Sequence, residues 1–273
     1  MSIKLIAIDI DGTLVDDQKQ LDTATSSLLS DLADKGVRVV LCTGRPYLGA
    51  QVYLEQMGFH KDSEQYVITH NGALISKTDS SFVKALPLDR NLVKKIMTYC
   101  LKKGLRFHLS THEHMYTPND PISPYTVNES HHTNMPLRPF MDIATVEHLD
   151  VFDVMIADDS HLLDKNEEAI RERFGKYCEI VRSEPHFIEF MHPHAGKGRA
   201  LDCLTQSLGI PSHEVMSIGN AQNDVSMLEF AGISVAVENA VPEVKAVSDF
   251  VTSSNNEQGV KRAIEYMKEH FKQ

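Results

Sequence analysis

The stretch KLIAIDIDGT, residues 4–13, decides the fold of this 273-residue chain. Residues 4–10 form an apolar run that is typical of a strand buried on both faces, as strands in parallel sheets are. The run ends in two carboxylates, Asp9 and Asp11, before Gly12. Side chains two apart on a strand point to the same face, so we expect both carboxylates on one face at the carboxyl end of this strand.

Strands and helices alternate along the rest of both halves of the chain. Strand-like runs occupy residues 37–42, 66–69, 215–218 and 233–237, and helical spacing occupies residues 21–35, 47–57, 198–208, about 224–231 and 258–271. This order predicts a parallel α/β sheet that is built from right-handed crossovers.

The middle of the chain has a different pattern. Strand-like runs at residues 105–109, 151–157, 179–181 and 187–191 accompany helical spacing at 91–103 and 162–174, and residues 117–139, rich in Pro, His and Asn, are expected to form a loop. We therefore expect a Rossmann-like core of residues 1–82 and 193–273, interrupted by an inserted α+β domain of residues 83–192.

Composition narrows the classes of partner and the cellular location. The formal net charge of −11 argues against a nucleic acid or an anionic membrane as partner, because either would repel the chain. No apolar stretch approaches the roughly 20 residues that a membrane span needs, and no signal peptide is indicated. The four cysteines are far apart without a C-x-x-C pair, which is typical of reduced thiols. The cytoplasm is the expected location.

Polar residues follow several of the predicted core strands. The second strand is followed by Thr43 and Gly44, the third by Asn71, and a late strand by a turn that runs from Asn220 to Asp224. In a parallel sheet these strand ends meet at one edge, where ligands bind. Carboxylates there could hold Mg²⁺, and a hydroxyl, a helix-start N–H and a Lys could bind phosphate. Taken alone, the Asp9–Asp11 pair could also be an ordinary solvated turn.

The order of these motifs resembles the haloacid dehalogenase (HAD) superfamily. The four elements are Asp-x-Asp-Gly-Thr at 9–13, Thr-Gly-Arg at 43–45, Gly-Lys-Gly at 196–198 and Gly-x-x-x-Asn-Asp at 219–224. Residues 71–73, 188–201 and 231–240 are more closely similar to the Cof-type, YidA-like sugar-phosphate phosphatases of subfamily IIB. The resemblance implies a HAD core with a C2B-type cap, and a Mg²⁺-dependent hydrolase of small phosphorylated metabolites, sugar phosphates above all.

The resemblance also implies a role for each motif residue. Asp9 would attack phosphorus, and Asp11 would protonate the leaving oxygen and then activate water. The phosphoryl group would be bound by the backbone of Ile10 and Gly44 and by the side chains of Thr43, Lys197 and Asn223. Mg²⁺ would be bound by Asp9, Asp11, Asn220 and Asp224.

Several alternatives stay open at this point. Arg45 could contact substrate or a surface carboxylate, and Asn71 could contact substrate or only its own turn. The family normally has Asp where this chain has Asn220, which predicts weaker Mg²⁺ binding because an amide carries no formal charge. A phosphomutase shares all four motifs, and a non-catalytic phosphometabolite sensor would be compatible with Asn220. The fourteen histidines lack zinc-ligand spacing, so solvated loop histidines are favoured.

Overall fold

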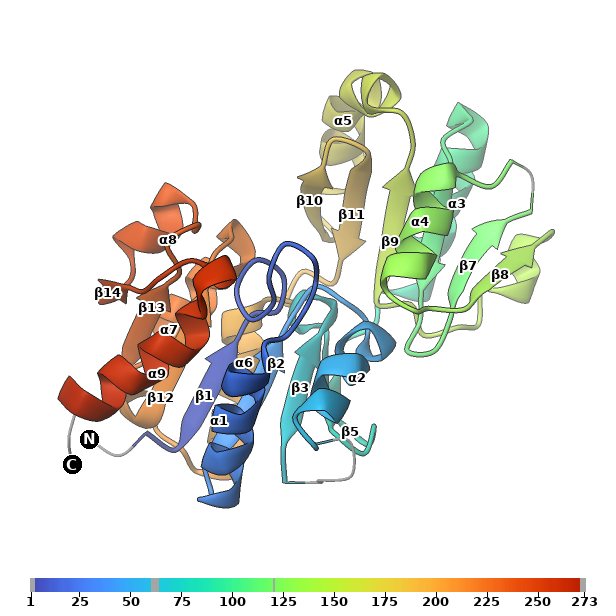
Figure 1. Cartoon of the computed structure of the whole chain (residues 1–273). Coiled ribbons are helices and arrows are strands. Elements are labelled where there is room, and N and C mark those ends of the chain that lie inside the picture. Colours follow the sequence, from blue (N-terminus) through green and yellow to red (C-terminus); the bar gives the residue numbers. More distant parts are fainter. Residues whose placement is uncertain (1–2, 60–63, 120, 271–273) are drawn as a thin grey trace. The chain divides into compact units, whose positions relative to one another are not determined.

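The structure, a computed structural model, describes residues 3–59, 64–119 and 121–270 (Figure 1). The chain divides into two compact units. Unit 1 comprises residues 1–44, 50–84 and 196–273, and unit 2 comprises residues 45–49 and 85–195. The predicted division into functional domains at residues 82/83 and 192/193 stays a prediction.

Unit 1 is built on a sheet of eight strands among the described residues, in the order β14-β13-β12-β1-β2-β3-β4-β5. The strands are β1 (Leu5–Ile8), β2 (Arg38–Cys42), β3 (Tyr66–Thr69), β4 (Leu74–Lys77), β5 (Phe82–Ala85), β12 (Val215–Gly219), β13 (Ile233–Ala236) and β14 (Phe250–Val251). The pairs from β14 to β3 are parallel, as predicted for this sheet, although β14 itself was not among the predicted strands. The prediction omitted β4, which pairs antiparallel with β3 because the short turn at residues 70–72 leaves no room for a crossover.

Six helices of unit 1 lie within the described residues: α1 (Thr23–Asp34), α2 (Tyr47–Gln56), α6 (Lys197–Leu208), α7 (Val225–Phe230), α8 (Pro242–Ala246) and α9 (Gly259–His270). The first turn of α2 falls in unit 2. Asp22 caps α1 by accepting hydrogen bonds from the N–H groups of Ala24 and Thr25. The helix predicted over 258–271 is confirmed to His270, whereas residue 271 lies outside the described part.

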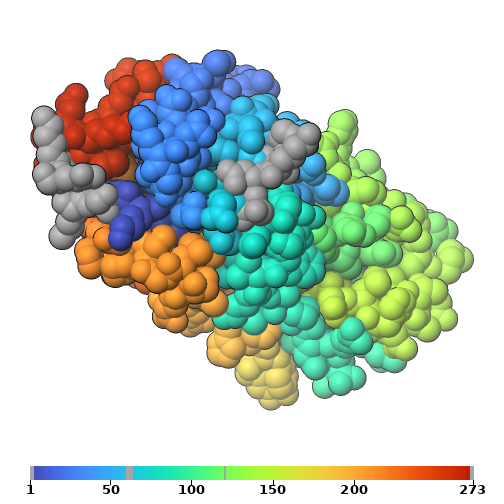
Figure 2. Space-filling view, turned by 90° about the horizontal axis from the view of Figure 1, so that it is seen from below, coloured from blue at the N-terminus to red at the C-terminus, as the bar shows by residue number. Residues whose placement is uncertain are grey.

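The two ends of the sequence pack together in unit 1. β1 pairs with β12 on one side and with β2 on the other, so the first strand lies inside the sheet. Figure 2 shows blue N-terminal atoms bordering orange and red C-terminal atoms on one face of the molecule. Leu5, Val40, Leu201 and Val215 belong to the same buried apolar cluster. The first strand therefore depends on residues more than 190 positions away.

Unit 2 has a six-stranded, mostly antiparallel sheet in the order β10-β11-β9-β6-β7-β8 within the described residues. Its elements are α3 (Arg90–Lys103), β6 (Phe107–Ser110), β7 (Met115–Pro118), α4 (Pro124–His132), β8 (Leu137–Phe140), β9 (Asp153–Ala157), α5 (Ser160–Phe174), β10 (Glu179–Glu184) and β11 (Phe187–Met191). Residues from α3, β6, β9, α5 and β11 form a buried core of its own. The expected α/β fold with an inserted α+β part is therefore confirmed.

The prediction of a loop over residues 117–139 is wrong. Helix α4 and strand β8 occupy much of this segment, and β8 pairs parallel with β7. Ser123 caps α4, Pro124 takes the first helical position, and Thr126 is fully buried against His108. The sequence pattern failed here because α4 buries few apolar residues. No helix in the described part of the chain is long and apolar enough to cross a membrane.

Candidate active site

The turn after β1 separates the two carboxylates of the first motif. β1 ends at Ile8, not at Ile10, and the N–H groups of Leu14 and Val15 both donate to the carbonyl of Ile10. Asp9 is buried, but Asp11 is 37% exposed. Strand periodicity, from which both side chains were expected on one face, does not apply to Asp11, because β1 ends before it and Asp11 lies in a turn.

A buried lysine lies between two carboxylates at the edge of the sheet. Lys197, the first residue of α6, donates from Nζ to Asp9 Oδ1 at 2.7 Å and to Asp224 Oδ1 at 2.6 Å. Lys197 is 1% exposed and Asp224 is fully buried. The predicted site residues Asp9, Lys197 and Asp224 are thus brought together from the end of β1, the start of α6 and the turn after β12.

One cation shared by two carboxylates leaves a net negative charge in this cluster. Burial and the charge of Asp224 raise the pKa of the Asp9 carboxyl from 3.8 to about 7, although Lys197 opposes both. Burial by itself lowers the pKa of the Lys197 ammonium, but Asp224 and Asp9 outweigh it, so that this pKa lies above its ordinary value. Lys197 therefore remains charged, whereas Asp9 needs a further positive group to be fully ionised at neutral pH.

Asp224 also shapes the turn that carries Asn220. Its Oδ2 accepts hydrogen bonds from the N–H groups of Asn220 at 2.9 Å and Ala221 at 3.0 Å. A Cβ on Gly219 would lie 2.6 Å from the side chain of Asp224, so only glycine allows this approach. With Lys197 on Oδ1, two N–H groups on Oδ2 and no exposed surface, Asp224 is a positioning residue for both Lys197 and the turn.

The ends of β2 and β3 are joined to the same edge through Asn71. The backbone N–H of Asn71 donates to the carbonyl of Thr43 at 3.0 Å, and its side-chain oxygen accepts from Asn223 Nδ2 at 2.9 Å. A Cβ on Gly44 would lie 3.2 Å from the Asn71 side chain. Asn71 has φ 52°, a left-handed conformation that Asn tolerates better than most residues. Thr43, Gly44 and Asn223 therefore gather around Asn71.

The backbone before Lys197 is held close to the turn at residues 70–72. A Cβ on Gly72 would lie 2.4 Å from the carbonyl oxygen of Gly196, and Gly72 has φ +94°. A Cβ on Gly198 would lie 2.2 Å from the carbonyl oxygen of Ser226. These close approaches fix the start of α6 and hence the position of Lys197.

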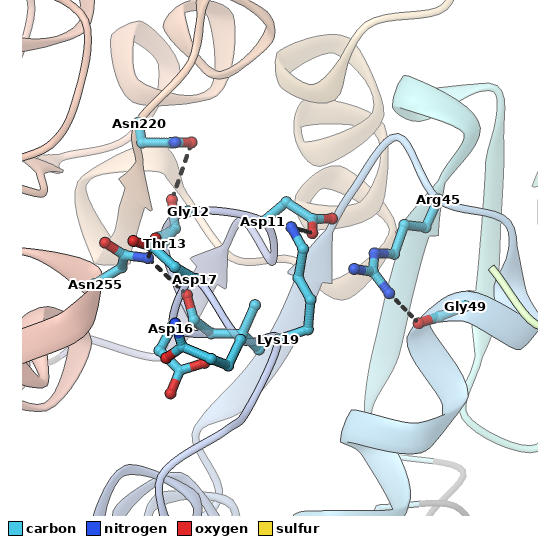
Figure 3. Close-up of polar contacts among 12 residues, drawn as sticks. Asp11, Gly12, Thr13, Asp16, Asp17, Lys19, Arg45, Gly49, Asn220 and Asn255 are labelled. Carbon is cyan, nitrogen blue, oxygen red and sulfur yellow. Dashed lines mark hydrogen bonds and ion pairs between the residues drawn. The ribbon is translucent and has the colours of Figure 1, made fainter. Parts of the chain in front are cut away.

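The remaining predicted residues have different surroundings. Ile10 is fully buried in the turn after β1. Arg45 Nη1 donates to the carbonyl oxygen of Gly49 at 3.3 Å, inside the first turn region of α2 that belongs to unit 2 (Figure 3). This contact lies within the segment that carries Arg45 itself.

Sequence reasoning missed the residues that hold the turn following Asp11. Lys19 Nζ contacts Asp11 Oδ1 at 2.6 Å, and Asn239 Nδ2 donates to the carbonyl of Gly12 at 2.8 Å. Asn255 Nδ2 donates to the carbonyl of Val15 at 3.0 Å. The paired Asn255 and Asn256 after a strand were a usable signal, since amides often complete turns, but nothing in the sequence around Lys19 marks it.

The donor set near Asp9 fits a hard cation. Lys197 occupies Oδ1 of Asp9, and among the described residues no hydrogen bond reaches Oδ2. Asn220 offers an amide oxygen, which accepts from Thr13 Oγ1 at 3.2 Å (Figure 3). These are the oxygen donors that Mg²⁺ prefers. In the described part of the chain no three His, Cys, Asp or Glu side chains cluster to hold a metal, so Asn220 and backbone oxygens are needed to complete this set.

The sequence matches the family described as haloacid dehalogenase-like hydrolase over residues 6–264. The chain therefore belongs to the haloacid dehalogenase-like hydrolases, and the resemblance predicted from its motifs is confirmed. Among its relatives is the Bacillus subtilis protein named "Putative phosphatase YxeH", which is 39% identical over 96% of this chain and 97% of its own length. The B. subtilis 5-amino-6-(5-phospho-D-ribitylamino)uracil phosphatase YcsE is 31% identical over 97% of this chain and 96% of its own length.

Solved structures have the same fold. A haloacid dehalogenase-like hydrolase from Bacteroides thetaiotaomicron superimposes with a TM-score of 0.91 at 28% identity, covering 97% of this chain and 100% of that one. The HAD subclass IIB sugar phosphatase BT4131 superimposes with a TM-score of 0.78 at 25% identity, covering 97% and 98%. Together with the curated relatives, these matches confirm the expected enzyme class, a phosphoric monoester hydrolase of the HAD family.

Proposed function

We propose that this phosphatase hydrolyses small phosphorylated metabolites, sugar phosphates in particular, through a covalent intermediate on Asp9. The observation that carries the proposal is the buried Asp9–Lys197–Asp224 cluster at the carboxyl edge of the sheet. It presents a buried carboxylate next to a fixed ammonium, which suits attack on an anionic phosphoryl group. BT4131, a sugar phosphatase by name, supports the substrate class.

In the proposed mechanism each residue has a separate task. Asp9 attacks phosphorus while the bond from phosphorus to the leaving oxygen breaks, and Asp11 gives that oxygen its proton. Water then attacks the phosphoryl group on Asp9, Asp11 takes a proton from the water, and inorganic phosphate leaves. Thr43, Lys197 and Asn223, with the backbone N–H groups of Ile10 and Gly44, stabilise the charge on the transferring group. Residues 83–192 would act as a cap that supplies substrate contacts.

The proposed Mg²⁺ site uses Asp9 Oδ2, the main-chain carbonyl of Asp11 and the side-chain oxygen of Asn220. Bound there, Mg²⁺ supplies positive charge that neutralises the phosphoryl group and keeps the Asp9 carboxyl ionised. Asp224 supports the set from behind, because its oxygens already accept from Lys197 and the turn. Arg45 and Asn71 stay candidates for substrate contacts.

A phosphate-release screen tests the proposal. The purified chain and Asp9→Asn are assayed with Mg²⁺ against a panel of phosphorylated metabolites, and products are examined for retained phosphate. We expect release from small sugar phosphates and a loss of at least about 10³-fold in Asp9→Asn, as is typical when a nucleophile is removed. Equal activity of both proteins would rule out covalent catalysis by Asp9, transfer without release would identify a phosphomutase, and binding without turnover would identify a sensor.

A further inference from the structure

Outside the buried cluster, Asp11, which is proposed to act first as the acid and then as the base, forms an ion pair. Lys19 Nζ lies 2.6 Å from Asp11 Oδ1, and the two side chains are 55% and 37% exposed (Figure 3). Exposed ion pairs usually contribute little to stability. The contact alone therefore says little about function, and the way in which the chain holds Lys19 matters more.

The backbone of Lys19 is held in an unusual conformation. Its φ is +60°, which disfavours side chains other than Gly, Asn and Asp. Its N–H donates to the carbonyl of Asp16 at 2.9 Å, and the next N–H, of Gln20, donates to Asp16 Oδ1 at 2.8 Å. Tyr53 Oη, from α2, donates to the carbonyl of Lys19 at 3.3 Å. A lysine thus occupies a position where glycine would be less strained.

The segment between Asp11 and Lys19 is also fixed from the C-terminal part of unit 1. Asn255 Nδ2 donates to the carbonyl of Val15 at 3.0 Å and to Asp17 Oδ1 at 3.1 Å. Asn256 Nδ2 donates to Asp17 Oδ2 at 3.0 Å, and the N–H of Asp17 donates back to Asn256 Oδ1 at 3.1 Å. The loop is therefore anchored immediately before Lys19, so the ammonium is presented to Asp11 from a fixed base.

We infer that Lys19 is a positioning residue for Asp11. Its ammonium, which contacts Oδ1, restrains the Asp11 carboxyl group to the orientation from which its protonated form delivers a proton to the leaving oxygen. The inference rests on the proposed function, because it assigns no task to Lys19 unless Asp11 transfers that proton. The inference therefore predicts that loss of Lys19 lowers kcat most for substrates whose leaving group must be protonated.

Two substrates separate this role from a structural one. A sugar phosphate leaves as an alkoxide that must be protonated, whereas p-nitrophenyl phosphate leaves as a stable phenolate. We expect Lys19→Met to lower kcat about fivefold or more on the sugar phosphate, to change KM little, and to lower kcat less than about twofold on p-nitrophenyl phosphate. Lys19→Arg should restore most of the lost kcat.

Two further variants control for folding and for charge. Lys19→Gly removes the ammonium but suits φ +60°, so it should be at least as stable as the wild type and still lose kcat on the sugar phosphate. Lys94→Met removes a matched pair in unit 2, since Lys94 Nζ lies 2.6 Å from Glu147 Oε2 with exposures of 55% and 40%. It should leave kcat on both substrates unchanged.

Three results would overturn the inference: equal losses of Lys19→Met on both substrates, wild-type kcat in Lys19→Met and Lys19→Gly, or an undiminished effect of Lys19→Met when added to Asp11→Asn. Failure of the proposed function has a different signature, namely full activity of Asp9→Asn. If Asp9 is essential while Lys19→Met behaves like Lys94→Met, only the role of Lys19 is refuted.

Discussion

Asp224 holds two parts of the candidate site together. Its two oxygens bind Lys197 and the N–H groups of Asn220 and Ala221, and none of its surface is exposed. One carboxylate therefore holds both the Lys197 ammonium, the proposed phosphate-binding group, and the turn that carries Asn220, the proposed amide ligand. A fully buried charge of this kind is costly unless every partner is present.

Asp224→Asn tests that double role. The substitution removes one of the two countercharges of Lys197 and gives an amide where two N–H groups need an acceptor. We expect kcat to fall roughly 10²-fold and unfolding stability to drop by about 2–4 kcal/mol. Steady-state kinetics and urea unfolding measure both effects.

Asp249→Asn is the matched control for Asp224→Asn. Asp249 Oδ2 accepts from the N–H of Ser234 at 2.8 Å and from its Oγ at 3.0 Å, next to β13, and it contacts no lysine among the described residues. It should lose stability while kcat stays near the wild-type value. Wild-type kcat in Asp224→Asn would contradict the role assigned to Asp224.

Asn220→Asp tests the proposed Mg²⁺ ligands through a measurement of Mg²⁺ affinity, without an activity assay. An Asp at this position can still accept from Thr13 Oγ1, and it adds a full negative charge to the proposed set of metal ligands. We expect Mg²⁺ affinity, measured by isothermal titration calorimetry without substrate, to rise about tenfold, which corresponds to roughly 1.4 kcal/mol. An unchanged affinity would mean that position 220 does not bind the metal.

Close backbone contacts between elements determine where the functional side chains lie. The turn after β3 touches the residue before α6, and the start of α6 touches α7, in each case at a glycine. The position of Lys197 is therefore set by the packing of the start of α6 against the turn after β3 and against α7. Any side chain at these glycines would push the start of α6 away.

Gly72→Ala should show this dependence. A Cβ there would lie 2.4 Å from the carbonyl oxygen of Gly196, and φ is +94°. We expect a loss of roughly 3–5 kcal/mol in the free energy of unfolding, together with reduced kcat. Gly58→Ala is the control, because Gly58 has φ +76° with nothing within 4 Å of a Cβ, and it should cost only about 1–2 kcal/mol. Equal losses in both variants would argue against the contact.

The alternation of strands and helices was predictable because buried parallel strands are continuous apolar runs, and β3 was predicted to the residue at Tyr66–Thr69. The segment around α4 was not predictable, since its burial depends on Thr126 and His108 rather than on apolar periodicity. Asp9, Lys197 and Asp224 could be proposed from motif order, but the sharing of Lys197 between both carboxylates required the structure. The partner of Asp11, Lys19, had no sequence signal because a left-handed turn brings it back over eight residues.

At the scale of the whole molecule, stability is predicted to depend on pH through unit 2. Burial is the largest influence on Glu189 in β11, and with Asp153 and Glu129 nearby it raises the pKa of this carboxyl from 4.5 to about 7, against the hydrogen bond from Ser183. A carboxyl whose pKa is raised on folding favours the folded state when protonated. Its contribution is therefore present below about pH 4.5 and is lost as pH rises toward 7.

Glu189→Gln removes this titration. Calorimetric melting should show the variant to be more stable than the wild type by roughly 1–3 kcal/mol at pH 8, with the difference shrinking toward pH 4. The exposed Glu172 in α5 provides the control, and Glu172→Gln should show no such trend. A difference that is constant with pH would rule out Glu189 as the titrating group.

The pairing of Asp9 with Lys197 spans 188 positions of sequence. At about 5–20 residues per second, a ribosome needs roughly ten to forty seconds to synthesise the residues between them. During this interval β1 has neither β12 beside it nor a countercharge at its end, and by the end of it residues 85–195 of unit 2 have been made. A newly made chain is therefore expected to acquire a folded insertion first and its catalytic edge last, so that this protein cannot process phosphate esters before its C-terminal third has left the ribosome.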